Sequence, residues 1–212
     1  MTERPYLPAA GRDAFLPLYD IVTRLGGFQR LADVLISQAA LQSGFRVLDI
    51  GCGTGTLAVA IKRRHPAVDV TGMDPDPLAL ARASAKAGAA GVSVRFDRGF
   101  GDALPYDAAS FERVFSSMMF HHVPKDEKPN VLREVRRVLR PGGALELLDF
   151  AGAHPHSFLA QVLHGRQPLS RAGEERMIGR FLDAGFAAAR KTDERGTVFG
   201  RVAFYEAVAA HE

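Results

Sequence analysis

The sequence has little of the features that mark a secreted or membrane protein. It holds a single cysteine, Cys52, which excludes an internal disulfide bond and a zinc site built on several thiolates. No apolar run approaches the roughly 18 residues of a membrane span, and residues 1–15 lack the apolar segment of a secretory signal. These absences favour a reducing compartment, and we expect a cytoplasmic protein without a membrane span.

Charge of one sign is not in large excess either. The 27 lysine and arginine residues against 24 acidic ones give a net charge of +3. The basic pairs Arg63–Arg64 and Arg136–Arg137 fall on expected helix faces beside acidic residues, so they predict no continuous patch for phosphates. Nucleic acid is therefore not an expected partner, although the positive balance keeps it as an alternative.

What is present is the composition of one globular domain. Hydrophobic residues make up 47% and charged residues 24% of the 212, which is typical of a soluble protein of this size. No repeat or linker divides the chain. Near its start, Leu16, Tyr19 and Val22 are in helical step. We therefore expect an N-terminal helical cap over residues 1–40, covering the site of a single domain at residues 41–212.

Strands and helices alternate along the first two thirds of the chain. Short apolar runs of the kind found in buried strands occupy residues 45–50, 68–73, 92–96, 111–115 and 144–150. Apolar positions recur at helical spacing over residues 56–64, 78–87 and 130–139. Asp76 and Pro77 form a typical helix start, and Gly88 a typical helix end. Connections of this length exclude hairpins and indicate parallel strands with helices on both faces.

The end of the chain follows another pattern. A helix is expected over residues 174–184, followed by strands over 186–190 and 198–208 that a polar turn around residues 193–196 joins. So short a connection permits an antiparallel hairpin. The predicted fold class is α/β: a Rossmann-like, doubly wound, mostly parallel seven-stranded sheet with an antiparallel C-terminal strand and helices on both faces.

A glycine-rich turn follows the first expected strand, and an acidic residue closes the second. The turn runs from Asp49 through Gly51, Gly53 and Gly55, and Asp74 ends the next strand. Glycines let the backbone turn tightly and come close to a ligand, and the helix that follows offers amide groups to it. In an open parallel sheet ligands bind at this place, and a carboxylate after the second strand can accept hydrogen bonds from ribose hydroxyls.

Two ligand classes suit such a turn. Nicotinamide and flavin enzymes use G-x-G-x-x-G, whose helix start receives a pyrophosphate. Here the spacing is G-x-G-x-G, and Asp49 lies two residues before the first glycine. A carboxylate at that place repels a pyrophosphate and attracts an ammonium group. An amino acid joined to a nucleoside therefore fits better than a dinucleotide, and a dehydrogenase is disfavoured.

These motifs resemble those of the class I S-adenosylmethionine-dependent methyltransferases, in particular the small-molecule group of ubiquinone and menaquinone biosynthesis. VLDIGCGTG at residues 47–55 resembles their first motif, and VTGMDPDPLALARA at residues 70–83 their second. Residues 104–123 and 132–150, the latter with its PGG turn, resemble the stretches around the fourth and fifth strands. The resemblance covers most of the chain. It implies S-adenosyl-L-methionine as cofactor and S-adenosyl-L-homocysteine as its product.

The resemblance implies roles for residues on the glycine-rich turn and at the end of the second strand. Asp49 would orient the turn and meet the methionine ammonium group, directly or through water. Gly51 and Gly53 would let the backbone pass against the cofactor, with Thr54 beside them. Asp74 would bind both ribose hydroxyls.

The resemblance also implies contacts further along the chain. Phe100 and Gly101 stand where the family has an acid or amide and then a small residue, which bracket the adenine. Phe100 departs from that polar pattern: either it stacks on the ring instead, or Asp97 or Asp102 substitutes as the acceptor for the amine. Ser117, just past the fourth strand, matches a position that contacts the methionine end.

His121 and His122 are the candidate catalytic residues. Either imidazole could be a general base for an acidic O–H, N–H or C–H acceptor. Adjacent side chains point in different directions, and the sequence does not choose between them. The alternative is a histidine at a helix start that bonds to the backbone. Cys52 is expected to be a packing residue, since no Cys–His pair brackets it, and no metal site is expected.

Together these observations predict a methyltransferase that moves a methyl group by in-line displacement to a small, lipophilic or aromatic acceptor. Alignment and desolvation supply most of the rate in such a transfer, so the sequence identifies the cofactor better than the acceptor. Two alternatives stay open: a nucleic-acid methyltransferase, and a non-catalytic cofactor-binding protein of the same fold. Neither the acceptor atom nor the oligomeric state is predicted.

Overall fold

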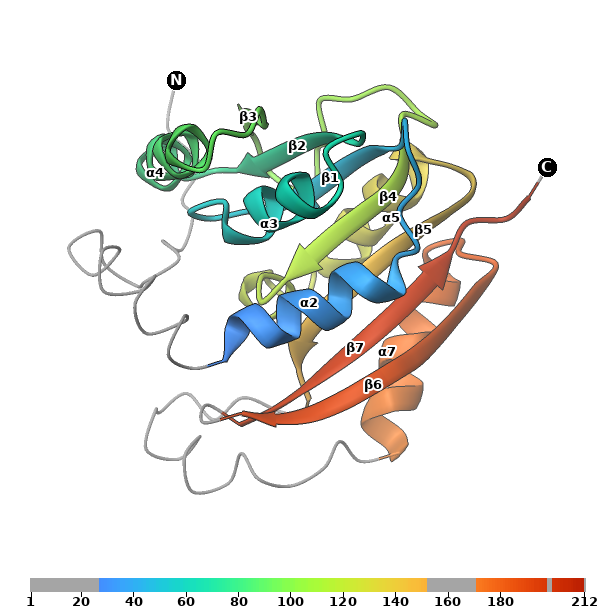
Figure 1. Ribbon diagram of the computed structural model, residues 1–212. Coiled ribbons are helices and arrows are strands. Elements are labelled where there is room, and N and C mark those ends of the chain that lie inside the picture. Colours follow the sequence, from blue (N-terminus) through green and yellow to red (C-terminus); the bar gives the residue numbers. More distant parts are fainter. Residues whose placement is uncertain (1–26, 152–170, 198–199, 212) are drawn as a thin grey trace.

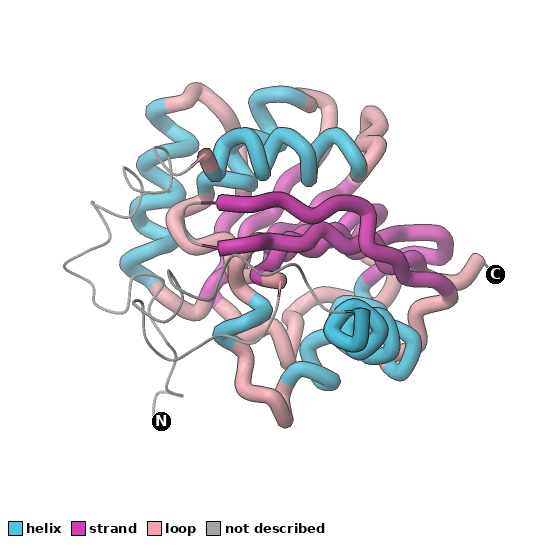
Figure 2. The backbone as a smooth tube through the Cα atoms, turned by 90° about the horizontal axis from the view of Figure 1, so that it is seen from below, coloured by secondary structure: helices cyan, strands magenta, loops and turns pink. Residues whose placement is uncertain are grey.

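The computed structural model describes residues 27–151, 171–197 and 200–211. Its strands form one seven-stranded sheet in the order β3-β2-β1-β4-β5-β7-β6, with helices on both faces (Figures 1 and 2). The strands are β1 (Arg46–Ile50), β2 (Asp69–Asp74), β3 (Arg95–Arg98), β4 (Phe111–Ser117), β5 (Leu139–Phe150), β6 (Ala188–Thr197) and β7 (Gly200–Val208).

The directions of the strands confirm the predicted fold class. β1 pairs in parallel with β2 and β4, β2 with β3, and β4 with β5. Only β7 runs the other way, because it is antiparallel to both β5 and β6. The chain winds outward from β1 to β3 and then returns to β4 on the other side of β1. A crevice therefore opens outside the carboxyl ends of β1 and β4, the place where such sheets bind ligands.

The helices cover the two faces of the sheet and bury two apolar clusters. One face carries α2 (Phe28–Gln38), α3 (Thr56–Arg64) and α4 (Pro77–Ala89), and the other α5 (Lys128–Val138) and α7 (Arg171–Asp183). The short 3-10 helix η2 (Phe120–His122) follows β4. Phe115 of β4 and Leu148 of β5 belong to the apolar cluster between the sheet and helices α2 and α3. Val135 of α5 and Phe181 of α7 belong to the apolar cluster on the other face. These clusters fix the strand ends that border the crevice.

Several expected boundaries are wrong. β5 begins at Leu139, five positions before the expected start at residue 144, and α7 begins at Arg171, three positions before residue 174. The helix expected to end at Gly88 continues to Ala89, and the glycine with a left-handed backbone is Gly91, with a φ of 65°. The third strand begins at Arg95, three positions later than expected. Residues 193–196, expected as a turn, lie inside β6. Their charged side chains belong to an edge strand, which accepts polar residues because one of its sides has no neighbouring strand.

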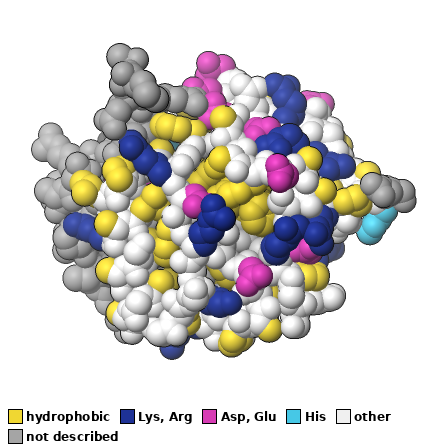
Figure 3. All heavy atoms as spheres, turned by 90° about the horizontal axis from the view of Figure 1, so that it is seen from above, with side chains coloured by type: hydrophobic (Ala, Val, Ile, Leu, Met, Phe, Trp, Pro, Cys, Tyr) yellow, Lys and Arg dark blue, Asp and Glu magenta, His cyan; other side chains and the backbone are white. Residues whose placement is uncertain are grey.

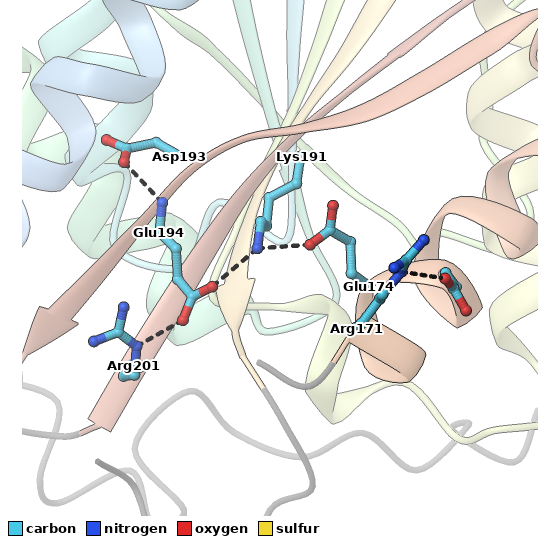
Figure 4. A network of polar contacts seen from close by, with 7 residues as sticks. Arg171, Glu174, Lys191, Asp193, Glu194 and Arg201 are labelled. Atoms are coloured by element: carbon cyan, nitrogen blue, oxygen red, sulfur yellow. Dashed lines mark hydrogen bonds and ion pairs between the residues drawn. The ribbon is translucent and has the colours of Figure 1, made fainter. Parts of the chain in front are cut away.

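An ion-pair network explains why β6 is so polar. Lys191 Nζ lies 2.6 Å from a carboxylate oxygen of Glu174 and 3.0 Å from one of Glu194, and Glu194 also pairs with Arg201 at 2.6 Å. Figure 4 shows how these side chains join the first turn of α7 to β6 and β7. Each pair is partly exposed and stabilises the fold only modestly.

The surface carries no large region of a single charge on the face drawn in Figure 3. Lysine and arginine side chains lie there beside aspartate and glutamate. In the described stretches, no helix is long and apolar enough to cross a membrane.

The expected N-terminal cap lies largely outside the described residues. Leu16, Tyr19 and Val22 belong to residues 1–26, of which the structure describes nothing. The described part of the region is α2, which buries Leu31 and Leu35 against the sheet. The division into a cap over residues 1–40 and a domain over residues 41–212 stays a prediction.

Candidate active site

A cavity of about 390 Å³ opens at the crevice outside β1 and β4. Every residue that the sequence assigned to the cofactor lines it: Asp49, Gly51, Gly53, Thr54, Asp74, Phe100, Gly101 and Ser117. They come from four separate stretches of the chain, the ends of β1, β2 and β4 and the loop after β3. The parallel sheet brings them together because the carboxyl ends of its strands share one edge.

The glycine-rich turn is bent so that its backbone borders the cavity. Gly51 has a φ of 65°, in the left-handed region that favours glycine. A Cβ atom built on Gly51 would lie 2.1 Å from Cγ of Met119, so glycine is also needed for space. The Gly53 N–H donates to Asp74 Oδ2 at 2.9 Å. The turn is thus fastened to the end of β2.

Asp49 is a buried carboxyl group with an unused oxygen. Its side chain is 1% exposed, and Oδ2 has no hydrogen-bond partner among the described residues. Burial, together with the smaller effect of the nearby charge of Asp74, raises the pKa of Asp49 to about 8. An unpartnered buried oxygen on the wall of a cavity fits a cationic ligand group, which would restore the charged form.

Asp74 accepts hydrogen bonds from the glycine-rich turn and can accept further hydrogen bonds from a ligand. Besides Gly53, it accepts the Asp76 N–H at 2.9 Å on its other oxygen. Burial raises the pKa of Asp74, while the hydrogen bonds from the Asp76 and Gly53 amides lower it. Each carboxylate oxygen accepts about two hydrogen bonds, so a second site remains on both oxygens. Those sites suit a pair of adjacent hydroxyls, as on a ribose.

The structure separates the two acids considered for the adenine amine. Asp97 accepts a hydrogen bond from the Tyr106 hydroxyl at 3.0 Å and pairs with Arg95 at 2.9 Å, and it is not among the cavity's lining residues. Asp102 lines the cavity next to Phe100 and Gly101. Of the two, Asp102 is therefore the acid that an adenine could reach.

The two candidate histidines occupy different positions. His122 lines the cavity, whereas His121 does not, and their ring centres are 3.9 Å apart. His121 Nδ1 lies 2.7 Å from Asp149 Oδ1, and its backbone N–H donates to Asp149 Oδ2, also at 2.7 Å. Sequence reasoning missed Asp149, although an acid at the end of the fifth strand was a signal that could have found it.

Apolar side chains complete the cavity. Met118, with a φ of 56°, turns the chain after β4, and both Met118 and Met119 line the cavity. Phe28 and Ala32 of α2 form another part of the wall. Beyond the helical spacing of the region, nothing in the sequence indicated that these two residues line a cavity. Phe120 is 1% exposed and belongs to the core.

Comparisons with known proteins find a methyltransferase domain in the part of the chain that forms most of this site. A family model described as a methyltransferase domain matches residues 47–143, which hold the glycine-rich turn and β2 to β4. A demethylmenaquinone methyltransferase of Deinococcus radiodurans is 40% identical over 140 residues, which cover 63% of this chain and 56% of the relative. Residues 47–143, somewhat under half of the chain, are thus similar to a methyltransferase domain. This match and the curated relatives support the predicted resemblance to the class I S-adenosylmethionine-dependent methyltransferases.

A second curated relative is named for a different kind of acceptor. The 27-O-demethylrifamycin SV methyltransferase of Amycolatopsis mediterranei is 40% identical over 123 residues, which cover 57% of this chain and 44% of the relative. The chain thus spans about half the length of these curated relatives.

Solved structures share the fold at low identity. A methyltransferase from Aquifex aeolicus superposes with a TM-score of 0.71 at 18% identity, covering 94% of this chain and 99% of the other. The [4+2]-cyclase SpnF superposes with a TM-score of 0.69 at 20% identity over the whole of both chains. The cyclase is named for another chemistry, so the fold alone does not establish methyl transfer.

Proposed function

We propose that the chain binds S-adenosyl-L-methionine in this cavity and transfers its methyl group to a small, lipophilic or aromatic acceptor. The charge of the cavity carries the proposal. Its described lining includes the carboxyl groups of Asp49, Asp74, Asp102 and Glu127, and no lysine or arginine. Such a lining favours a ligand with ammonium and sulfonium charges and disfavours the pyrophosphate of a dinucleotide.

The residues present fit this cofactor from end to end. The unpartnered oxygen of Asp49 would take the ammonium group, with Ser117 at the same end, and Asp74 would take the ribose hydroxyls. Phe100 would stack on the adenine while Asp102 accepts its amine. When bound, the cofactor supplies a methyl group on a positively charged sulfur. The chain's part is to align that group with the acceptor and to exclude water.

The acceptor side of the proposal rests on the apolar wall and on the relatives. Met118, Met119 and Val123 line the cavity, and flexible apolar side chains of this kind suit lipophilic or aromatic molecules. The two curated relatives are named for a quinone precursor and a rifamycin. A nucleic-acid acceptor is not favoured, because an acidic lining repels phosphates. The cytoplasmic location and the oligomeric state stay open to experiment.

Calorimetric titration tests the cofactor. We expect one-to-one binding of S-adenosylhomocysteine and no binding of NADH. Asp74→Ala is expected to weaken S-adenosylhomocysteine binding by about 1.5–3 kcal/mol, the scale of hydrogen bonds to a charged group. Asp69→Ala, on the exposed start of the same strand, is the matched control and should leave binding unchanged. Equal affinity in the Asp74 variant and the wild type would contradict the ribose site.

A further inference from the structure

A carboxyl group is buried under α2, far from the chemistry proposed for the cavity. Glu146, in the middle of β5, has a relative exposure of 0%. Its Oε2 accepts the Gln38 Nε2–H at 2.6 Å, while Oε1 has no hydrogen-bond partner among the described residues. A buried carboxylate needs several donors to offset the loss of its hydration. With one neutral donor, the charged form of Glu146 is poorly stabilised under the helix.

The charged groups around Glu146 do not offset its burial. Glu206 of β7 is its direct neighbour in register and carries a like charge. Arg190 of β6 pairs with Glu206 at 2.7 Å, and Arg113 of β4 donates to two main-chain carbonyl groups, each at 2.8 Å. Burial above all, and Glu206 to a smaller extent, raise the pKa of Glu146 to about 7, although the Gln38 hydrogen bond and the two arginines lower it.

Gln38 connects Glu146 to a further strand. The amide oxygen of Gln38 accepts the Thr192 hydroxyl at 2.8 Å, and its amide nitrogen donates to Glu146. Thr192 lies at an irregularity of β6, where the pairing with β7 shifts between Lys191 and Asp193. Irregularities of this kind redirect a side chain, and here the hydroxyl reaches α2. One amide group thus ties the last turn of α2 to both β5 and β6.

A groove of about 500 Å³ separates α2 from β6 along this connection. Its lining comes from one side of α2 and from β6: Asp33, Val34, Ser37, Gln38, Thr192 and Asp193. The charged residues of α2 itself lie at the surface, because Arg30 is exposed and Asp33 pairs with Arg64 of α3. Since the groove is open to solvent, an outward movement of α2 would bring water to Glu146.

The other end of α2 belongs to the wall of the cofactor cavity. Phe28 and Ala32, in its first two turns, line that cavity, whereas Leu31 and Leu35 are buried against the sheet. The helix has 11 residues and lies on the same face as α3 (Figure 1). A helix of this length has little stability without its contacts to the rest of the protein. A change in how its last turn is held therefore reaches the wall of the cavity.

These contacts make the attachment of α2 sensitive to one ionisable group. We propose that protonated Glu146 holds α2 on the sheet, and that ionisation of Glu146 loosens the helix, so that this part of the cavity wall opens more often as the pH rises. Protonated Glu146 accepts the Gln38 hydrogen bond without placing a charge in the core. The ionised group gains from hydration, which an outward movement of α2 supplies. The closed form, with α2 on the sheet, stays the major one at every pH.

The consequence for a ligand rests on the proposed function, whose site this device would regulate. A ligand in the cavity meets the wall at Phe28 and Ala32. A ligand that binds the closed form in preference shifts the population towards it. Bound S-adenosylhomocysteine should therefore make opening of α2 rarer, and the open form is the one through which a ligand enters.

Hydrogen exchange of the backbone amides of α2 tests the proposal in the ligand-free protein. The wild type is compared with Glu146→Gln at each pH, so that the intrinsic exchange rate cancels. A carboxyl group with a pKa of about 7 in the closed form and 4.5 when exposed stabilises the closed form fully below pH 4.5, and this stabilisation is lost as the pH rises through 7. The opening constant of the wild type relative to the variant should rise about tenfold between pH 6 and pH 8.

Two segments and two variants serve as controls. Amides of α5 that exchange by local opening should show no such trend, and α2 should exchange faster than β1, which reports unfolding of the whole sheet. Thr192→Val removes the bond from β6 and should raise the opening of α2 at every pH without removing its trend. Glu206→Gln should move the trend to lower pH, because the neighbouring like charge is lost. A merely structural Glu146 would give no trend to move.

Three outcomes would overturn the proposal. They are a ratio for α2 that is flat between pH 6 and pH 8, exchange of α2 as slow as that of β1, and an equal trend in α5. Saturating S-adenosylhomocysteine should slow the exchange of α2 at pH 8 about tenfold or more. If the compound binds by calorimetry and leaves α2 unchanged, the connection between α2 and the cavity fails while the proposed cofactor site stands. If the wild type does not bind it, the proposed function fails, and exchange in the ligand-free protein still decides the role of Glu146.

Discussion

The buried carboxyl group of Asp49 should make cofactor binding depend on pH. With a pKa of about 8, the group is ionised to about 1% at pH 6 and to about half at pH 8. An ammonium group placed against it favours the ionised form, so binding must expel the proton. Between pH 6 and pH 8 the affinity for S-adenosylhomocysteine should therefore rise about 50-fold, equivalent to about 2.3 kcal/mol.

Calorimetry in buffers of different ionisation enthalpy measures this proton directly. At pH 6 we expect the wild type to release about one proton on binding, and at pH 8 about half a proton. The side chain introduced by Asp49→Asn is neutral at every pH. Protons released by the ligand itself are the same in the variant and the wild type, so the difference in proton release between the two proteins belongs to Asp49. An affinity that is flat between pH 6 and pH 8, or equal proton release in both proteins, would refute the reasoning.

Two further predictions concern stability. Burial raises the pKa of Glu146 to about 7 from its ordinary 4.5, so the wild type should lose about 2.5 kcal/mol relative to Glu146→Gln between pH 5 and pH 8. Urea unfolding measures this, with exposed Glu175→Gln as a control that should show no such trend. Gly51→Ala should lower the melting temperature, because the left-handed backbone costs about 1–2 kcal/mol and the added Cβ has no room. Gly88→Ala, in open space within a helix, should be neutral or stabilising, and equal melting temperatures for the two alanine variants would contradict the argument.

The boundaries that the sequence predicted well are those set by local chemistry. Asp76 caps α4 by accepting the Leu78 N–H at 2.8 Å, and Pro77 takes the first helical position, as expected. The Gly88 prediction failed because glycine is tolerated inside a helix when tertiary packing stabilises it. The turn expected around residues 193–196 failed because polar residues at a sheet edge look like a loop in sequence. Only the pairing with β7 shows that they form a strand.

The sequence by itself predicted the alternation of strands and helices, the resemblance to a methyltransferase family and the residues gathered at the edge of the sheet. It could do so because strand and helix periodicity, and the backbone needs of a glycine-rich turn, are properties of neighbouring residues. Only the tertiary structure decided that His121 contacts Asp149, that Asp102 rather than Asp97 lines the cavity, and that α2 supplies part of its wall. Those choices depend on residues far apart in the chain, such as His121 and Asp149, 28 positions apart. A contact of that kind leaves no periodic signal, because it exists only once β4 and β5 lie side by side in the sheet.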